Sequence, residues 1–179
     1  MKIIILVGFL ILITPKNLRN TADCNCNTDQ NKLLNLQNTL RKKHKSPSLT
    51  KTAQVTKFAQ QATDHCVKIG KPEHTTHSYK NTVISQNIYV SSWAPSADDV
   101  IQGWYYEEEP HYDYAKGKSK DGGETGHFTA MIWKSTKEIG CAYTYGKWRS
   151  TNGYYVACEY YPTGNSPGEF TKNIVKPSS

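Results

Sequence analysis

The stretch GETGHFTAMIWKSTKEIGCAY, residues 123–143, joins a glycine-rich approach to an apolar run that ends in tryptophan. Phe128 lies three residues before Met131 and four before Ile132, which is the spacing of one face of a helix. We therefore predict a short helix here, with His127 at or just before its first turn. A histidine at such a boundary is a candidate for binding or for bracing the fold.

Strands are predicted late in the chain. Residues 139–145 alternate apolar side chains on one face, and residues 154–161 repeat the alternation after a polar connection. This pattern predicts an antiparallel hairpin. Residues 81–91 form either a further strand or a buried irregular segment, because periodicity alone does not decide between the two.

Three helices are predicted earlier. Leucines recur at three- and four-residue intervals over residues 28–43, which is typical of an amphipathic helix. The same stepping continues through a second helix as far as Gly70, a residue well suited to end it. A third helix begins at Ser96, whose hydroxyl can cap the amide of Asp99, and Pro110 closes it. Helices early and strands late predict an α+β fold.

The N-terminal segment differs from the rest of the chain. Its apolar run IIILVGFLILIT follows a lysine and is too short to cross a bilayer comfortably. We therefore predict a signal peptide over residues 1–22 and one secreted domain over residues 23–179. No later segment approaches the roughly 20 apolar residues of a transmembrane helix.

The charge of the chain gives no reason to expect a nucleic-acid partner. The formal charge of +7 falls to +4 when Lys2, Lys16 and Arg19 are removed with the signal peptide. The remaining basic residues are spread without a concentrated block, and we expect runs such as LRKKHK to be solvated.

Four segments together closely resemble the CAP superfamily, also called SCP/TAPS. They are GHFTAMIWKSTKEIGCAY, YYVACEYYPTGN, NTLRKKHKSPSLT and WYYE. The family includes venom-allergen-like proteins of parasitic worms, and the resemblance spans about residues 28–175. It implies a three-layer α-β-α sandwich around a central, mainly antiparallel sheet, an order of layers that periodicity does not supply.

The resemblance also implies a polar cleft. Family members often place two histidines and two glutamates there, and several bind zinc or another divalent cation. His77 matches the first histidine, with His74 as a nearby competitor; His127 matches the second, and Glu107 matches the glutamate of the third helix. Gln86 stands where the second glutamate is usual, so we expect a weakened metal site and no required cofactor.

The spacing of the third helix gives a separate reason to choose Glu107. Val100, Trp104 and Glu107 are four and three residues apart, so this carboxylate shares the face of the tryptophan, and Glu108 is its nearest rival. The alternative to a metal site is a hydrogen-bonded polar network that braces loops against helices. A metal-dependent hydrolase is a further alternative, but no nucleophile is presented convincingly, so we expect no catalytic residue.

Aromatic side chains cluster in the segment WYYEEEPHYDYAKG. The resemblance associates this region with sterol binding, which makes Tyr105, Tyr106, Tyr112 and Tyr114 candidate lipid-binding residues. In the family a fatty acid can also lie between the first and fourth helices, whose candidate walls here are Leu33, Leu36, Leu40, Phe128, Met131 and Ile132. We therefore predict a secreted protein that binds sterol or fatty acid at a host interface; the alternative is a non-lipid immunomodulatory protein that binds host proteins.

Five cysteines follow the predicted signal peptide, and in an oxidising compartment most of them should pair. The resemblance implies a disulfide between Cys141 and Cys158 on the predicted hairpin. Cys66 would then pair with the N-terminal arm, where Cys24 and Cys26 compete for it.

Overall fold

The computed structural model of the chain describes residues 26–177. Its helices are α1 (Cys26–Lys43), α2 (Ala53–Ile69), α3 (Ala97–Ile101), α4 (Gly126–Ile132) and α5 (Phe170–Asn173), with a π-helical turn η2 (Gln102–Tyr106) and a 3-10 turn η3 (Glu109–His111) after α3. Its strands are β1 (Thr50–Lys51), β2 (Ser78–Tyr79), β3 (Thr82–Val83), β4 (Ser85–Ser91), β5 (Tyr112–Asp113), β6 (Lys118–Ser119), β7 (Glu138–Trp148) and β8 (Thr151–Tyr161).

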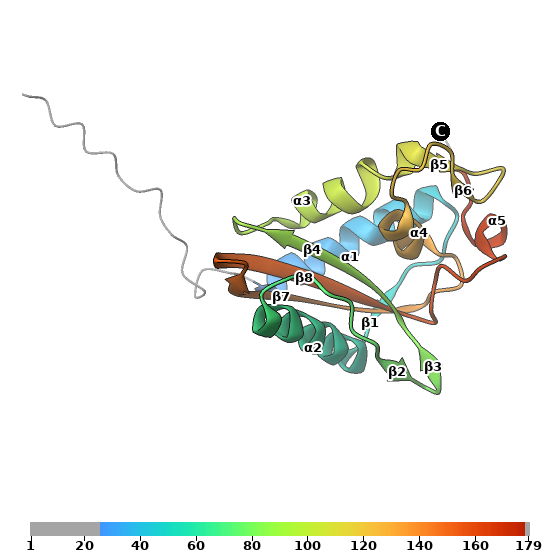
Figure 1. Ribbon diagram of the computed structural model, residues 1–179. Coiled ribbons are helices and arrows are strands. Elements are labelled where there is room, and N and C mark those ends of the chain that lie inside the picture. Colours follow the sequence, from blue (N-terminus) through green and yellow to red (C-terminus); the bar gives the residue numbers. More distant parts are fainter. Residues whose placement is uncertain (1–25, 178–179) are drawn as a thin grey trace, which may run out of the picture.

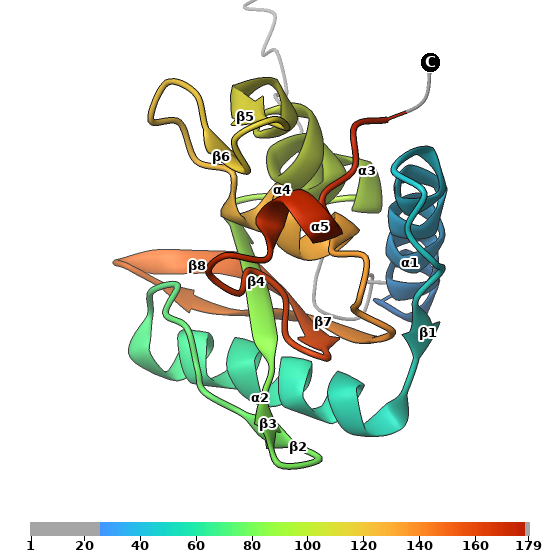
Figure 2. The ribbon, with the colours of Figure 1, turned by 90° about the vertical axis from the view of Figure 1, so that its right-hand side faces the viewer.

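These elements form three layers (Figures 1 and 2). The central sheet has the order β1-β7-β8-β4, with β1 parallel to β7 and the other neighbours antiparallel. Helix α2 covers one face, while α1, α3 and α4 cover the other. The predicted α+β sandwich with a mainly antiparallel sheet is confirmed. The predicted signal peptide lies outside the described residues, and no helix in residues 26–177 has both the length and the apolar character to span a bilayer.

The predicted helix boundaries are realised through the caps that the sequence offers. The Ser96 hydroxyl accepts from the backbone of Asp99, and the Asp99 carboxylate accepts in return from the Ser96 amide, which forms a complete capping box. Gly70 ends α2 with φ 75°, a left-handed conformation that glycine adopts without strain. Residues 81–91, which the sequence left open, become β3 and the edge strand β4.

The β7–β8 hairpin carries the predicted disulfide. Cys141 and Cys158 are directly opposite each other in the strand register and are bonded, which confirms the prediction. Cys66, in contrast, is buried, and its sulfur faces the backbone of Glu73. It has no disulfide partner among the side chains that the structure describes. Cys24 and the side chain of Cys26 lie outside them, so the predicted pairing of Cys66 with the N-terminal arm stays a prediction.

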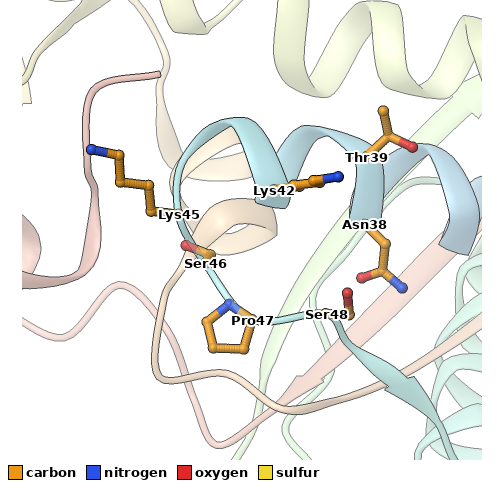
Figure 3. Close-up of a pocket in the computed structure, with 7 residues that line it drawn as sticks. All are labelled: Asn38, Thr39, Lys42, Lys45, Ser46, Pro47 and Ser48. Carbon is orange, nitrogen blue, oxygen red and sulfur yellow. The ribbon is translucent and has the colours of Figure 1, made fainter. Parts of the chain in front are cut away.

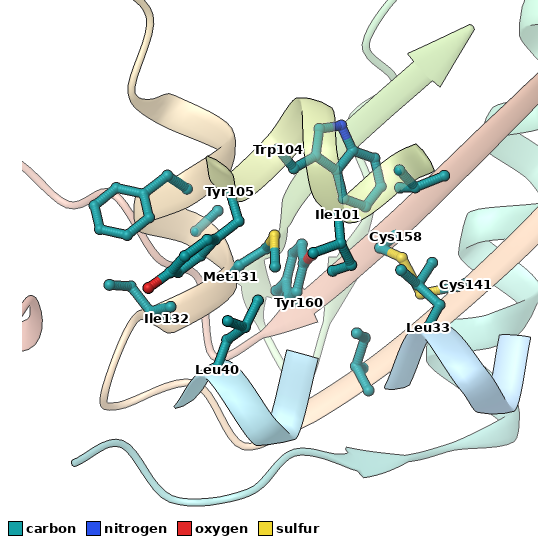
Figure 4. Packing of buried hydrophobic residues seen from close by; sticks show 14 of the residues in the cluster. Leu33, Leu40, Ile101, Trp104, Tyr105, Met131, Ile132, Cys141, Cys158 and Tyr160 are labelled. Carbon is teal, nitrogen blue, oxygen red and sulfur yellow. A yellow bond between two sulfur atoms is a disulfide. The ribbon is translucent and has the colours of Figure 1, made fainter. Parts of the chain in front are cut away.

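The two helical layers contact the sheet in different ways. On the side of α1, α3 and α4, large side chains fill a wide core around Trp104, Met131 and Tyr160 (Figure 4). On the side of α2, the contact is close because the residues are small. A Cβ at Gly140 would lie 2.0 Å from the amide nitrogen of Thr56, so only glycine fits beneath this helix.

The C-terminal end of α1 is fastened to the C-terminal end of α4 by a buried arginine. Arg41 is fully buried, and its guanidinium donates to the carbonyl oxygens of Met131, Trp133 and Thr136 at 2.8–2.9 Å and, through Nε, to Pro47. Burial lowers the pKa of Arg41 to about 10. The carbonyls at the end of a helix lack partners within it, so this side chain satisfies groups that would otherwise be buried and unpaired.

We expect Arg41→Met to lower the free energy of unfolding by about 3–5 kcal/mol, because it leaves several buried carbonyls without donors. Lys42→Met is the matched control, since Lys42 is the next residue on the same helix and is exposed. Urea unfolding followed by circular dichroism measures both. Equal stability of the two variants would contradict the role given to Arg41.

Candidate functional site

The first polar pair of the expected cleft lies where α4 begins. Nδ1 of His127 is hydrogen-bonded to Oε1 of Glu108, and the amide of Phe128 donates to Oε2 of the same carboxylate at 2.9 Å. The His127 ring stacks on Trp104 with centroids 6.1 Å apart. Glu108 is buried, whereas the His127 side chain is 30% exposed. The carboxylate therefore orients the histidine and also caps the helix that carries it.

The choice of Glu107 for this position was wrong, and the reason is local. The amide of Glu107 donates to the carbonyl of Gln102, five residues back, so the chain forms a π-helical turn after α3. Such a turn takes up about one more residue than an α-helical turn, which moves the inward-facing position one residue along. Glu107 is consequently exposed, and its rival Glu108 faces inward.

The second polar cluster lies on the α2 side of the sheet. Nδ1 of His77 is 3.0 Å from Oε1 of Glu159, and Nε2 of Gln86 donates to the same oxygen at 2.6 Å. Gln86 and Glu159 are directly opposite each other in the β4–β8 register. The His77 ring stacks on Phe58 of α2. Glu159 is fully buried, and its Oε2 has no hydrogen-bond partner among the described residues.

Glu159 was not among the predicted site residues, although the sequence contained a signal for it. It is the one acidic residue in the apolar segment YYVACEYY, at a position that faces the packed side of a central strand. Because charged side chains are almost never fully buried without a partner, its presence there predicts a polar neighbour. The identity of that neighbour depends on strand register, which the sequence does not fix.

The two clusters are separate. Gln86 faces α2, and its neighbour Asn87 faces the other side of β4, where it donates to the carbonyl of His127 at 3.0 Å. The competing histidine, His74, has its Nδ1 2.7 Å from Oε1 of Gln86. No three His, Cys, Asp or Glu side chains among residues 26–177 are placed to share a metal ion, so the predicted cluster of His77, Glu107 and His127 is not formed.

Burial controls the protonation of the cluster on the α2 side. It raises the pKa of Glu159 to about 8 and lowers the pKa of His77. Both shifts favour the neutral form, so near neutral pH the pair is a carboxylic acid against a neutral imidazole. This arrangement avoids a buried charge and fits a bracing network better than a metal ligand set.

The four candidate tyrosines have different environments. Tyr105 and Tyr112 are buried, and the Tyr105 hydroxyl lies 2.7 Å from Nε2 of the buried His44. Burial raises the pKa of both tyrosines to about 12. Tyr114 is partly buried against the same core and donates to Glu109. Of the four, only Tyr106, at 51% exposure, is presented to a ligand at the surface, whereas Tyr105 and Tyr112 belong to the core.

The apolar groove also lies elsewhere than predicted. The facing side chains of α1 and α4 close into core, because Leu33, Phe128, Met131 and Ile132 are fully buried. A cavity of about 180 Å³ instead lies between α1 and α3. Its lining residues are Leu36, Thr39, Leu40, Lys43, Asp98, Ile101, Gln102 and Tyr106.

A second hollow of about 570 Å³ lies over the C-terminal end of α1. It is lined by Asn38, Thr39, Lys42, Lys45, Ser46, Pro47 and Ser48 (Figure 3). Figure 3 shows the side chains of Lys42 and Lys45 pointing away from each other. Because they do not converge, this hollow is a weaker candidate for a binding site than the groove between α1 and α3.

Comparison with known proteins identifies the family. The model of the cysteine-rich secretory protein family, CAP, matches residues 34–160. The chain belongs to the CAP family. It is 31% identical over 143 residues to cysteine-rich secretory protein 2 of Homo sapiens, an alignment that covers 76% of this chain and 57% of that protein. It is 30% identical over 150 residues to the human Golgi-associated plant pathogenesis-related protein 1, an alignment that covers 82% of this chain and 92% of that protein. The chain thus spans just over half the length of cysteine-rich secretory protein 2.

Solved structures confirm the CAP fold. Venom allergen-like protein 4 of Schistosoma mansoni matches with a TM-score of 0.61 at 22% identity, covering 83% of this chain and 96% of that chain. The structure of NaASP2 with Zn²⁺ matches with a TM-score of 0.59 at 22% identity, covering 88% and 90%. The family and the worm-type structural resemblance expected from the motifs are therefore confirmed.

The direct pairing of Gln86 with Glu159 makes a charge-swap test possible in this CAP protein. Gln86→Glu replaces a donor with a second acid beside the buried carboxyl, so we expect it to lower the free energy of unfolding by about 2–4 kcal/mol. The double variant Gln86→Glu/Glu159→Gln restores one acid and one amide, and we expect it to recover most of that loss. Urea unfolding measures both, and a double variant no more stable than the single one would refute the pairing.

The raised pKa of Glu159 also predicts how stability depends on pH. The folded-state value of about 8 exceeds the ordinary 4.5, so the folded state binds more protons between these values and stability falls as pH rises. Below pH 6.5 the lowered pKa of His77 has the opposite effect, because there the unfolded state binds more protons at this residue and stability rises with pH. The effect of Glu159 is therefore seen most clearly between pH 6.5 and 8. In this window we expect the free energy of unfolding of the unaltered protein to fall, relative to that of Glu159→Gln, by up to about 1.4 kcal/mol per pH unit. Parallel pH profiles of the two proteins would contradict this.

Proposed function

We propose that this CAP protein is secreted and binds a fatty acid, or a similar single-chain lipid, in the groove between α1 and α3. The observation that carries the proposal is the apolar wall of that groove. Leu36 and Leu40 lie on successive turns of α1, Ile101 faces them from α3, and the exposed Tyr106 ring borders the opening. Covering such surface with hydrocarbon is favourable by about 25 cal/mol per Å².

The rim of the groove suits an acid at one end of the chain. Lys43, in the last turn of α1, and Gln102, at the end of α3, supply an ammonium and an amide. Both groups can donate to a carboxylate. The acidic rim residue, Asp98, is already engaged by Lys32, which reduces its repulsion of an anionic ligand.

The size of the groove favours a linear chain over a sterol. Pockets that enclose a drug-sized ligand usually hold at least roughly 300 Å³. A cavity of about 180 Å³ is smaller, so it would take part of an acyl chain and leave the remainder along the surface. The rigid ring system of a sterol cannot be divided in this way.

A metal-dependent hydrolase does not have comparable support. NaASP2 was solved with Zn²⁺, but here each histidine faces a single carboxyl group, whereas catalytic zinc sites usually have three protein ligands. The residues therefore do not fit such a centre, and we propose that the function requires no metal and is not enzymatic. Secretion is supported by relatives such as the secreted protein RBT4 of Candida albicans, which is 35% identical over 138 residues and covers 76% of this chain and 35% of that protein.

Filling the groove provides the test. Leu36→Trp places an indole in the cavity at a partly exposed position, so we expect the affinity for a labelled long-chain fatty acid to fall about tenfold or more, which is about 1.4 kcal/mol or more of binding. Val83→Trp adds the same ring to exposed β3, away from the groove, and should bind as the unaltered protein does.

Both affinities are measured by equilibrium retention of the label, and circular dichroism verifies the fold. Unaltered retention by Leu36→Trp, or an equal loss in Val83→Trp, would overturn the proposal. No retention by the unaltered protein would favour a role in binding host proteins instead.

A further inference from the structure

Two tryptophans and two basic residues gather at one end of the central sheet. They are Trp93, in the loop between β4 and α3, and Lys147, Trp148 and Arg149, at the turn of the β7–β8 hairpin. We call this group the aromatic-basic end. Figure 1 shows the hairpin turn and the β4–α3 loop together at the left-hand tip of the molecule. No part of the lipid groove or of the two polar clusters uses these residues.

Trp93 is held outward. The residue is 59% exposed, and its neighbours Ser92 and Ala94 are exposed as well. Its amide donates to the hydroxyl of Ser91 at 3.1 Å, which ties the loop to the end of β4. A large indole kept in water on a fastened loop indicates a surface that contacts something else.

Trp148 lies beside the same end of β4. A Cβ at Gly153 would be 2.8 Å from the Trp148 ring and 2.9 Å from the carbonyl oxygen of Ser91. The indole of Trp148 therefore crosses over Gly153 toward Ser91, two residues before Trp93. The absence of a side chain at residue 153 is what allows the ring to occupy this place.

The two basic side chains lie on either side of Trp148 in the sequence, at the turn of the hairpin. The Arg149 guanidinium lies over the Trp148 ring, 5.3 Å from its centroid, and the Arg149 amide donates to the carbonyl of Gly70 at 2.7 Å. The stem of Lys147 packs against Gly70. Neither cation forms an ion pair with an acidic residue in the described part of the chain.

Acidic residues close to this end in the sequence are already occupied. Asp98 is paired with Lys32, Asp99 belongs to the capping box of α3, and Glu73 is held by Lys71 at 2.5 Å. Two of these three carboxylates are therefore paired with lysines, while Lys147 and Arg149 have no acidic partner among the described residues and add positive charge at the hairpin turn.

We infer that the aromatic-basic end binds an anionic membrane surface, with the indoles of Trp93 and Trp148 at the headgroup level and Lys147 and Arg149 on the anionic headgroups. Tryptophan is enriched at membrane interfaces because its ring is apolar and its N–H is polar. Basic residues near an anionic bilayer each strengthen binding about fivefold. A stable protein interface would instead need about 800 Å² per partner around an apolar centre, and here the residues that follow in the hairpin turn, Ser150, Thr151 and Asn152, are polar and exposed.

Cosedimentation of the secreted chain with vesicles tests this inference. We expect binding to vesicles of phosphatidylcholine with phosphatidylserine and little binding to phosphatidylcholine alone. Trp93→Ser should weaken binding to the anionic vesicles about tenfold, and Lys147→Gln/Arg149→Gln should weaken it by a factor of about 25. Val83→Ser, which removes an exposed apolar side chain from β3, should bind as the unaltered chain does.

Each result decides for or against the inference. No binding by the unaltered chain, unaltered binding by Trp93→Ser, or an equal loss in Val83→Ser would overturn it. So would a change in oligomeric state of Trp93→Ser without vesicle binding by the unaltered chain, since this would assign the surface to a second copy. The inference does not rest on the lipid groove, and Leu36→Trp should bind vesicles normally.

Discussion

Arg41 is buried without an acidic partner among the described residues, and most of this structure depends on how that charge is accommodated. The carbonyls after α4 carry the negative end of a helix dipole, so they can stabilise a cation without a carboxylate. Two neighbours complete the junction: Ser46 donates to the carbonyl of Ile132, and His44 lies 2.6 Å from that of Val175. This junction fixes α4, and through α4 the place of His127, while it also fixes the axis of α1 that forms one wall of the groove.

Sequence patterns predicted what depends on local chemistry. The capping box at Ser96, the glycine stop at residue 70 and the disulfide-bonded hairpin are all present, because each depends on nearby residues or on a motif with fixed spacing. The run LRKKHK was expected to be solvated, yet Arg41 and His44 are buried. Both lie at helical spacing on the inward face that begins at Leu33, so the periodicity indicated their burial. Their charged or polar character led to the opposite prediction. The π-helical turn and the pairing across β4 and β8 depend on tertiary packing, which the local sequence did not reveal.

The cluster on the α2 side contains a carboxyl group although Gln86 stands at the position where the resemblance places one. The resemblance led us to expect one fewer carboxylate at Gln86, but Glu159 supplies a carboxyl group from the neighbouring strand at the directly opposed position. This carboxyl group lies beneath α2 and is fully buried. A carboxyl that is neutral near pH 7 can accept from Gln86 and still meet a neutral imidazole without a buried ion.

The π-helical turn connects the pair of His127 and Glu108 with the groove between α1 and α3. By taking up one extra residue after α3, it turns Glu108 inward to His127, and within the same few residues it leaves Tyr105 in the core and Tyr106 at the surface. Tyr105 is held by the His44 ring, so the turn cannot rotate freely, and Tyr106 is fixed at the edge of the groove. Residues of regular α-helical spacing would not meet both requirements, since shifting the turn by one residue exchanges the inward and outward positions. The π-helical turn, which made the prediction of Glu107 wrong, therefore positions side chains both beside His127 and at the edge of the groove.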